Sequence, residues 1–346
     1  MSAISPTPTT TPDWNLAPLA GLSQVKGRTD ATLSDAPIGQ FLLDTVQRFP
    51  NRLAAVFREQ NVRWTWAQFQ AEVDAFASGL QALGLQVGER VGIWSPNRLE
   101  WLVTQFATAR AGLVLVNINP AYRVTELEYA LNLSGCRALV TAEHLKSSRY
   151  LEMLQRLAPE LATCQAGALQ STRLPSLQMV IRLGDEKTPG MLNYAEVLET
   201  GRAAVDVAAL DALATGLSCF DAINIQFTSG TTGNPKGATL THHNVVNNAR
   251  FIAQAMNFSD ADSLCIPVPL YHCFGMVLAV LACVSTGAAM VFPGESFDPV
   301  ATLEAVSEEG CTALHGVPTM FIAELDHPRF AEFDLSRLRT GIMAGS

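Results

Sequence analysis

The sequence of 346 residues predicts an α/β fold with parallel sheets. Short, continuous apolar runs alternate with stretches of helical periodicity, which is typical of parallel strands covered on both faces. Hydrophobic residues make up 48% of the chain, enough to bury a sizeable core. The length exceeds the roughly 100–200 residues of an average domain, so we expect either two packed units or one large one.

The first half of the chain supplies one series of strands and helices. Residues 1–37 carry scattered Pro, Thr, Ser and Asp without periodicity, and we expect a loose leader there, followed by a folded part over 38–346. Apolar residues at helical spacing predict a helix over 68–83 that Gly84 ends. The elements expected next are a strand over 90–94, a helix over 99–110 capped by Asn97, a strand over 113–116, a helix from Thr125 to Leu133 closed by Gly135, and a strand over 138–141.

The second half repeats this alternation. Residues 222–227 form an apolar run typical of a buried strand, and residues 276–284 predict an apolar helix. Between the halves, residues 160–200 have weaker periodicity and more punctuation, so we place a subdomain boundary there. The last predicted elements are a strand over 288–292, a helix that begins at Asp298 and Pro299 and ends at Gly310, and a strand over 311–314.

The composition excludes several classes of protein. Acidic residues number 32 against 23 basic ones, and the formal charge of −9 argues against a nucleic-acid binder with a concentrated basic face. The longest apolar run, 276–284, is far shorter than the roughly 20 residues of a membrane-spanning helix. Residues 1–14 lack the basic and apolar segments of a secretory signal. The seven cysteines form no C-x-x-C pair, so we expect reduced, buried thiols in a cytoplasmic protein.

One loop carries the strongest chemical signal. Residues 228–237 have the sequence Thr-Ser-Gly-Thr-Thr-Gly-Asn-Pro-Lys-Gly and follow the strand predicted over 222–227. Their glycines let the backbone approach a ligand closely, and successive backbone N–H groups in such a loop can form an anion-binding nest. Hydroxyl groups add donors, and Lys236 adds a positive charge. Phosphate is the anion that fits this combination best.

Two other interpretations of the loop are weaker. A flexible, solvated loop would have a similar composition, but a generic linker seldom places a lysine directly after a proline beside a buried strand. The nucleotide-binding pattern G-x-x-x-x-G-K-[ST] does not fit, because Pro235 stands where its second glycine would fall and Gly237 follows Lys236. The loop therefore predicts a phosphate site of another kind.

This loop, continued to Asn244, resembles the phosphate-loop signature of the adenylate-forming enzymes, which include acyl-CoA synthetases, luciferases and peptide-synthetase adenylation domains. The resemblance covers residues 38–346 and is closest to fatty-acyl-CoA synthetases of the medium-chain type. It implies the large N-terminal domain of that family, with two parallel-sheet αβαβα subdomains. Further segments that resemble core motifs of the family are Trp64-Thr65-Trp66 with Phe69, 109–112 with 117–120, 269–275 and 316–320.

The resemblance implies an ATP-dependent ligase that works in two steps. A carboxylate attacks the α-phosphorus of ATP and releases pyrophosphate, and the thiol of coenzyme A then displaces AMP from the acyl-adenylate. Donors and a cation that hold the leaving pyrophosphate lower the barrier electrostatically, and Mg²⁺ would share that load, with the Thr228 hydroxyl as a ligand. The residues expected at the phosphates are Thr228, Ser229, Gly230, Thr231, Thr232, Gly233, Asn234, Pro235 and Lys236, with Lys236 catalytic.

The resemblance also implies a binding site for the acid. His272 matches a family position beside the substrate carboxylate, where an imidazole N–H could orient the attacking oxygen; the alternative is a satisfied core histidine. His315 either lines the acyl pocket or simply ends a strand, and His242 and His243 are expected at the start of a helix rather than on a metal. The apolar stretch 276–284 offers either an acyl tunnel or ordinary core packing. The expected substrate contacts are Tyr271, His272, Met276, Gly316, Met320 and Gly345.

Several segments that the family uses after this point have no counterpart here. Residues 341–346 are expected to form a strand and a turn, and nothing matches the Tyr-Gly-x-Thr-Glu segment, the ribose-binding aspartate, the hinge or the mobile lid. We therefore expect a C-terminally truncated chain that lacks most of the later β-barrel and the lid domain. Because the lid provides much of the positioning of the reactants, residues 1–346 alone are expected to have little or no ligase activity.

Two other functions stay open. One is a non-catalytic protein that binds a nucleotide or an acyl group on the same scaffold. The other is an adenylation domain for an aryl or amino acid, although no aspartate suited to hold an amine is found between Thr241 and His272. The sequence fixes neither the acyl chain length nor the oligomeric state; members of the family can form homodimers and act near lipid, but no amphipathic basic helix is evident.

Overall fold

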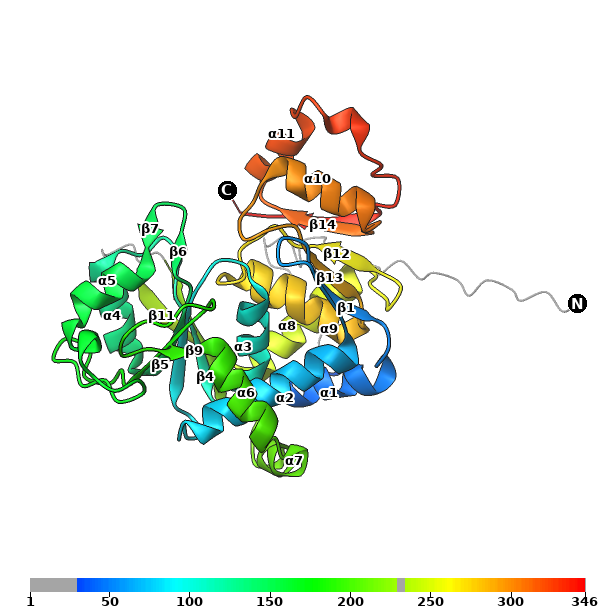
Figure 1. Cartoon of the computed structure of the whole chain (residues 1–346). Helices are drawn as coiled ribbons and strands as arrows, with labels where there is room; N and C mark the ends of the chain where they lie inside the picture. Colours follow the sequence, from blue (N-terminus) through cyan, green and yellow to red (C-terminus); the bar gives the residue numbers. More distant parts are fainter. Residues whose placement is uncertain (1–29, 229–233, 346) are drawn as a thin grey trace, which may run out of the picture. The chain divides into compact units, whose positions relative to one another are not determined.

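The computed structural model describes residues 30–228 and 234–345. The described residues from Ser34 onward form one compact unit, and residues 30–33, which lie outside it, contain no helix or strand. Within this unit, helices pack around two large β-sheets, and β6 (His144–Leu145) and β7 (Ser148–Arg149) form a small two-stranded sheet (Figure 1).

The described helices begin with α1, directly after the segment that the sequence predicts as a leader. They are α1 (Ile38–Arg48), α2 (Trp66–Ala82), α3 (Leu99–Arg110), α4 (Val124–Ser134), α5 (Tyr150–Leu157), α6 (Tyr194–Ala204), α7 (Val207–Thr215), α8 (His242–Ala255), α9 (Ala282–Thr286), α10 (Pro299–Glu308) and α11 (Pro318–Leu325). Short 3₁₀ helices are η2 (Pro159–Ala162) and η4 (Phe330–Glu332), and η3 (Phe274–Leu281) is a π-helix.

The described strands are short, as expected for parallel sheets buried on both faces. They are β1 (Leu53–Phe57), β2 (Val62–Thr65), β3 (Arg90–Trp94), β4 (Val114–Asn117), β5 (Cys136–Thr141), β6 (His144–Leu145), β7 (Ser148–Arg149), β8 (Met179–Arg182), β9 (Leu192–Asn193), β10 (Ala222–Thr228), β11 (Lys236–Thr241), β12 (Ser263–Cys265), β13 (Ala289–Phe292), β14 (Ala313–Gly316) and β15 (Thr340–Met343).

The two large sheets are mixed but mostly parallel. The six-stranded sheet has the order β15-β14-β12-β13-β1-β2, and the seven-stranded sheet has the order β11-β10-β4-β3-β5-β8-β9. Only the edge pairs β1–β2 and β10–β11 of these sheets are antiparallel. The predicted α/β class with parallel sheets is therefore confirmed, and the carboxyl ends of the parallel strands share one edge in each sheet.

Two adjacent residues of β12, whose side chains point to opposite faces, show that the six-stranded sheet is packed on both faces. Leu264 belongs to the main core, which extends into the seven-stranded sheet through residues such as Val91 and Ile93. Cys265 belongs instead to a smaller cluster with Val306 of α10. In Figure 1, α10 and α11 lie on one side of this sheet and α8 and α9 on the other. Burial on both faces explains why its strands are continuous apolar runs in the sequence.

Several predicted boundaries agree with the structure. The strand over 90–94 and the helix over 99–110 are confirmed as β3 and α3. Asp298 accepts a hydrogen bond from the backbone N–H of Ala301 at 2.8 Å and so caps α10, in which Pro299 is the first residue. Gly84, with φ +87°, follows the end of α2, and Gly135 ends α4 with φ +61°. Local sequence signals decide these boundaries because each cap is made within a few residues of its own helix.

Other predictions of local structure were wrong. Asn97 does not cap α3, whose N-cap is Arg98, and Thr125 lies inside α4 rather than at its cap, Arg123. By contrast, the apolar helix expected over 276–284 is confirmed, although its first part is the π-helix η3 and only its continuation, α9, is an α-helix. The strand predicted over 311–314 begins two residues later, because Cys311 closes the turn after α10 by donating its N–H to Val306.

Residues 160–200, where the sequence predicts a subdomain boundary, contribute strands to the seven-stranded sheet. β8 and β9, which lie within 160–200, extend the seven-stranded sheet beyond β5. The chain leaves the six-stranded sheet after β2 and returns to it at β12. Each sheet is thus completed by strands whose partners lie far away in the sequence.

Two further findings concern membrane spans and cysteines. Across residues 30–228 and 234–345, no helix is both long and apolar enough to cross a bilayer. All seven cysteines lie in the described residues, each with a free thiol; five are buried, and Cys164 and Cys273 are partly exposed. Free, mostly buried thiols are what the sequence predicts.

Candidate active site

The carboxyl ends of the two large sheets meet at a small cavity of about 120 Å³. Most of the residues that line it lie just after the carboxyl end of a parallel strand, in the connections that follow β3, β4, β12, β13 and β14. Ligands of open α/β sheets bind outside the carboxyl ends of the strands. The lining residues are Pro96, Asn97, Pro120, Leu145, Pro267, Pro269, Tyr271, Glu295, Ser296, Phe297 and Met320.

The predicted phosphate loop joins two antiparallel strands at the edge of the seven-stranded sheet. Thr228 is the last residue of β10, Lys236 is the first of β11, and the two are paired across the hairpin. Ser229, Gly230, Thr231, Thr232 and Gly233 lie outside the described residues. The hairpin therefore carries its lysine beside the start of the loop, at the carboxyl end of β10.

Lys236 is available to an anion. Its side chain is exposed, as are Thr228 and Asn234, and Pro235 is half-buried. Within the described part of the chain, the Lys236 ammonium group has no ion-pair partner. A lysine in an unrelated buried ion pair would have argued against phosphate binding, and the structure shows no such pair among these residues.

His272 lies in the connection between β12 and η3. Its Nδ1 accepts a hydrogen bond from the backbone N–H of Phe274 at 3.1 Å, so the neutral ring carries its hydrogen on Nε2. The ring is exposed, yet partial desolvation lowers its pKa, which favours the neutral form near pH 7. The described residues give Nε2 no partner, so its N–H can donate to a ligand oxygen.

Two asparagines hold the connection that carries His272: Asn97, which follows β3, and Asn117, the last residue of β4. Asn97 donates to the carbonyl of Val268 at 3.0 Å and accepts from the N–H of Leu270 at 2.8 Å. Asn117, the last residue of β4, donates to the carbonyl of Tyr271 at 2.9 Å. Neither role is visible in the sequence, where Asn97 is expected at a helix cap and Asn117 is part of a motif, because their partners lie far away along the chain.

These contacts bring the two predicted parts of the site together. Asn117 is paired in the sheet with Gln226 of β10, and Thr228 follows Gln226 by two residues. The same Asn117 contacts the carbonyl of Tyr271, the residue before His272. The phosphate-loop hairpin and the histidine therefore lie at one edge of one sheet.

The expected substrate contacts fall into three places. Tyr271 and Met320 line the small cavity together. Gly316 and Gly345 lie next to each other at the ends of β14 and β15, where the N–H of Ala344 donates to the carbonyl of Gly316 at 3.2 Å. Met276 is buried and does not line this cavity; its sulfur lies 3.5 Å from Nδ2 of Asn117.

The other histidines singled out in the sequence serve the fold. His315 is fully buried; its Nδ1 accepts from the N–H of Ile342 at 3.2 Å, and its Nε2 lies 3.2 Å from the carbonyl of Leu278. Burial lowers its pKa to about 4, so it ties β15 to η3 as a neutral ring. His242 starts α8 and accepts from the N–H of Ile38 at 3.0 Å. Both have structural partners.

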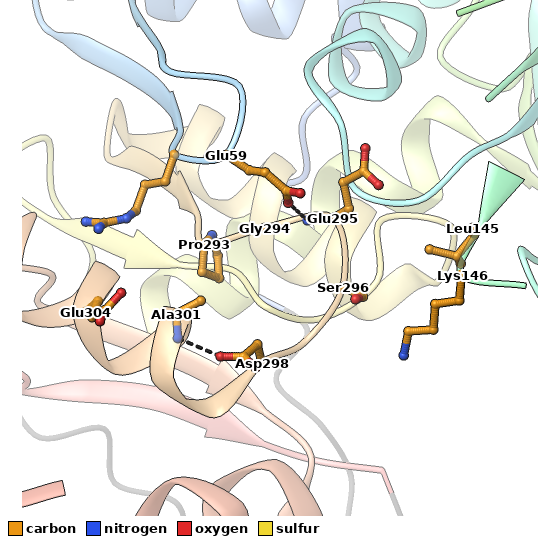
Figure 2. A pocket seen from close by; sticks show the side chains of 11 residues that line it. Glu59, Leu145, Lys146, Pro293, Gly294, Glu295, Ser296, Asp298, Ala301 and Glu304 are labelled. Carbon is orange, nitrogen blue, oxygen red and sulfur yellow. Dashed lines mark hydrogen bonds between the residues drawn. The ribbon is translucent and has the colours of Figure 1, made fainter. Parts of the chain in front are cut away.

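A larger hollow of about 520 Å³ adjoins the cavity and shares three of its lining residues (Figure 2). Its carboxylates include Glu59, which accepts from the backbone N–H of Glu295 at 2.8 Å, and Asp298, which caps α10. None of the site residues predicted from the sequence lines this hollow. We therefore place the candidate active site at the smaller cavity and the β10–β11 hairpin.

Comparison with known proteins adds independent evidence. Residues 42–346 match the family model described as AMP-binding enzyme. The chain is 45% identical over 336 residues to the medium-chain acyl-CoA ligase ACSF2, mitochondrial, of Rattus norvegicus, which covers 96% of this chain and 54% of the relative. It is 46% identical over 316 residues to the putative acyl-CoA synthetase YngI of Bacillus subtilis (strain 168), which covers 91% of this chain and 57% of the relative. The chain thus spans about half the length of these relatives.

Solved structures share the fold. The crystal structure of the anthranilate CoA ligase AuaEII in complex with anthranoyl-AMP has a TM-score of 0.77 at 22% identity, over 92% of this chain and 56% of that one. The Mycobacterium tuberculosis fatty acyl CoA synthetase has a TM-score of 0.74 at 25% identity, over 89% of this chain and 55% of that one. The two sheets are therefore an arrangement known from solved structures.

Proposed function

The chain belongs to the AMP-binding enzyme family, and from this premise we propose that it forms the nucleotide- and acid-binding part of an acyl-CoA ligase. The observation that carries the proposal is the joining of the Lys236 hairpin and the His272 connection at one sheet edge through Asn117. Adenylation of an acid needs both a polyphosphate site and a carboxylate site within reach of one phosphorus atom.

The proposed reaction begins with the acid. One carboxylate oxygen attacks the α-phosphorus of ATP, a new oxygen–phosphorus bond forms, and the bond to the leaving pyrophosphate breaks. The neutral His272 donates its Nε2–H to the carboxylate of the acid and so orients the attacking oxygen. In the second step the thiol of coenzyme A attacks the acyl carbon, and AMP leaves.

Lys236 and the hairpin act on the leaving group. Negative charge grows on the pyrophosphate as its bond breaks, and a positioned cation stabilises that charge more strongly than it stabilises the ground state. Lys236, Thr228 and Asn234 are exposed at the ends of the hairpin loop and are able to contact the β- and γ-phosphates. The loop residues Ser229–Gly233 belong to the same proposal on sequence grounds.

Mg²⁺ would accompany ATP and neutralise charge on its phosphates. No group of three or more His, Cys, Asp or Glu side chains suited to a metal is found among residues 30–228 and 234–345. Mg²⁺ in phosphate-transfer sites keeps several waters and uses few protein ligands besides the phosphates. The exposed Thr228 hydroxyl at the end of β10 fits such a minor ligand.

The cavity favours an apolar acid over an amino acid. Among the described residues that line it, Glu295 is the one carboxylate; it forms an ion pair with Arg98 and is therefore not free to hold a substrate amine. Tyr271 and Met320 offer apolar contact area, and each buried methylene of an acyl chain contributes roughly 0.8 kcal/mol. We propose a medium-chain fatty acid as the substrate, with Tyr271 and Met320 in contact with the chain, Met276 beneath the site, and Gly316 and Gly345 at its border.

The test is acid-dependent exchange of pyrophosphate into ATP by the complete protein that contains this chain, with acids of graded length. Lys236→Ala should lower kcat/KM for ATP about tenfold to a hundredfold, the effect of losing one charge-assisted hydrogen bond. Lys187→Ala removes a surface lysine paired with Glu196 and serves as the control, with unchanged kinetics expected. Exchange without any acid dependence contradicts the proposed function, and normal ATP kinetics in Lys236→Ala removes Lys236 from it. Residues 1–346 alone should show little exchange.

A further inference from the structure

We propose that Asn117 is a positioning residue that fixes His272 relative to the phosphate-loop hairpin; this inference rests on the proposed function. Asn117 is buried at the carboxyl end of β4. Its amide group connects the strand that leads into the hairpin with the connection that carries His272. No local sequence signal suggests this role.

Each polar atom of the Asn117 side chain has a defined partner. Nδ2 donates to the carbonyl of Tyr271 at 2.9 Å, and Oδ1 accepts from Nδ2 of Asn224 at 2.9 Å. Asn224 belongs to β10, and its Nδ2 also donates to the carbonyl of Leu115 at 3.1 Å. The path from β10 to the residue before His272 therefore consists of two buried amide side chains joined by one hydrogen bond.

The connection around His272 needs such side chains because residues 266–272 form neither helix nor strand. Without a ladder of backbone hydrogen bonds, their conformation depends on other donors and acceptors. Among the described residues, Asn117 is the one that donates a hydrogen bond to the Tyr271 carbonyl, and Asn97 forms hydrogen bonds with Val268 and Leu270. Asn97 holds the start of the connection, whereas Asn117 acts next to His272 itself.

The role proposed for Asn117 concerns the geometry of the site rather than the stability of the fold. A reacting group displaced by about 1 Å can cost about a hundredfold in rate, because the near-attack arrangement is lost. Without Asn117, the Tyr271 carbonyl loses the hydrogen bond from Nδ2, and the imidazole of His272 can move away from the hairpin. We therefore expect the loss of Asn117 to reduce kcat for adenylation while ATP affinity, which depends on the hairpin, changes little.

The experiment compares Asn117→Leu with wild type in acid-dependent pyrophosphate exchange by the complete protein. Leucine is close to asparagine in size but makes neither hydrogen bond. We expect kcat to fall about tenfold to a hundredfold, with the KM for ATP within about threefold of wild type. Asn193→Leu is the control: Asn193 is also buried and donates to the carbonyl of Gly184 at 2.7 Å, far from the site, so its loss should lower stability without lowering kcat per folded molecule.

A double-mutant cycle separates positioning from a general structural role. If Asn117 acts through His272, then Asn117→Leu in a His272→Ala background should change kcat less than about threefold. An equal loss in both backgrounds, or an unchanged kcat in the single variant, overturns the inference while the proposed function stands. Absence of acid-dependent exchange by wild type overturns the proposed function and this inference with it. Should Asn117→Leu fail to fold, Asn117→Asp at pH 8.5 keeps the acceptor for Asn224 and carries the same expectations.

Discussion

His272 shows how the immediate surroundings of one residue set its chemistry. The Phe274 N–H occupies Nδ1, and partial desolvation lowers the pKa of the ring. The neutral ring therefore has one free N–H, on Nε2, and no free acceptor. This is the form that can orient a carboxylate without neutralising the charge that makes it a nucleophile.

The residue-scale prediction is a loss of adenylation at acid pH. Because the pKa of His272 lies below its ordinary value near 6.5, the neutral form persists at pH 7 and is lost only as the pH falls through that lowered value. Protonation places a hydrogen on Nδ1, which breaks the bond from Phe274, and adds a positive charge beside the carboxylate. We expect kcat/KM for the acid to be flat from about pH 8 to 7 and to fall below about pH 6.5.

The control is His272→Asn, whose side chain does not titrate. It should have lower activity throughout and no corresponding fall on the acid side of the ordinary histidine pKa. The same acid limb in both proteins would assign the titration to another group. The fall in rate at low pH should also be absent from any reaction of the protein in which the carboxylic acid substrate takes no part.

At the scale of elements, the start of η3 depends on a close approach between two backbone segments. A Cβ added at Gly275 would lie 2.3 Å from the carbonyl oxygen of Pro269, far closer than real contacts allow. The N–H groups of Gly275 and Met276 both donate to the His272 carbonyl, each at 3.0 Å. The π-helix thus begins directly on the connection that carries the histidine, and π-helical turns are frequent at functional sites.

We predict that Gly275→Ala displaces the start of η3 and reduces exchange activity more than tenfold, since the added methyl group meets rigid backbone rather than a flexible side chain. The free energy of unfolding should fall by about 1–3 kcal/mol, the usual cost of overpacking. Exchange kinetics and urea unfolding measure the two effects.

Gly39→Ala is the matched control for this substitution. Gly39 lies within α1, and a Cβ there would have its nearest neighbour at 3.6 Å, an ordinary contact. Because alanine favours helix more than glycine does, we expect unchanged activity and stability equal to or slightly above wild type. Equal losses in both variants would contradict the role given to Gly275.

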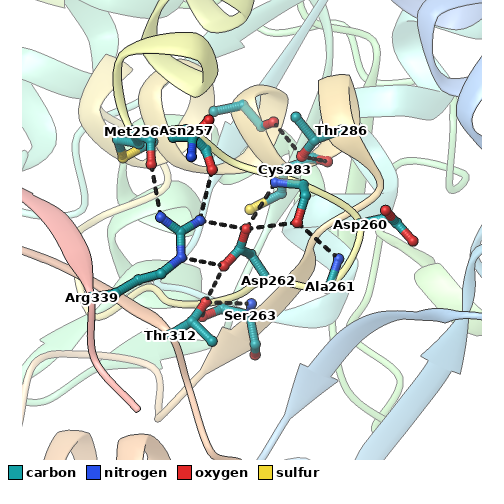
Figure 3. A network of polar contacts seen from close by, with 12 residues as sticks. Met256, Asn257, Asp260, Ala261, Asp262, Ser263, Cys283, Thr286, Thr312 and Arg339 are labelled. Atoms are coloured by element: carbon teal, nitrogen blue, oxygen red, sulfur yellow. Dashed lines mark hydrogen bonds and ion pairs between the residues drawn. The ribbon is translucent and has the colours of Figure 1, made fainter. Parts of the chain in front are cut away.

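At the scale of the whole molecule, an ion pair between the buried Asp262 and the exposed Arg339 joins segments far apart in the sequence (Figure 3). Asp262 accepts from Nε and Nη2 of Arg339 at 2.9 and 2.6 Å, and from the hydroxyl of Thr312 at 2.7 Å. Arg339 also donates to the carbonyls of Met256 and Asn257 at 3.1 and 2.8 Å. The pair therefore fixes the start of β15 against β12, β14 and the end of α8.

Asp262 makes the stability of the fold depend on acid pH. Burial alone would raise its pKa, but hydrogen bonds from Arg339, Thr312 and Ser259 outweigh burial and lower it to about 2. A folded-state pKa below the ordinary value of about 3.9 means that the stabilisation is present above pH 4 and is lost as the pH falls toward 2. The difference corresponds to about 2–3 kcal/mol.

We predict that Arg339→Met lowers the free energy of unfolding at pH 7 by about 3 kcal/mol, because it leaves a buried carboxylate without its charged partner. The variant should also lose the extra sensitivity between about pH 4 and 2. Arg173→Met is the control: Arg173 pairs with Glu128 on the surface, and an exposed pair contributes less than about 1 kcal/mol. Urea unfolding over a range of pH measures both, and equal losses would contradict a special role for Asp262.

The features that sequence alone identified are those decided by neighbours along the chain. Local hydrogen bonding explains the N-cap of α10 and the C-cap of α4. Local periodicity explains the bounds of β3 and α3 and the position of Lys236 beside a strand. The family motifs directed attention to His272 and the hairpin, which the structure brings to one edge. Boundaries with competing signals, such as that of α4 at Thr125, were placed less well.

Only the tertiary structure shows the side-chain hydrogen bonds that join segments far apart in the sequence. An asparagine before a helix is a good cap in isolation. The amide of Asn97 instead bonds to Val268 and Leu270, which lie 171 and 173 residues later in the chain. Asn117, Asp262 and Arg339 likewise find partners that no local pattern encodes. A buried polar group must satisfy its hydrogen bonds wherever the packed chain offers a partner, so its role is fixed only when distant segments come together.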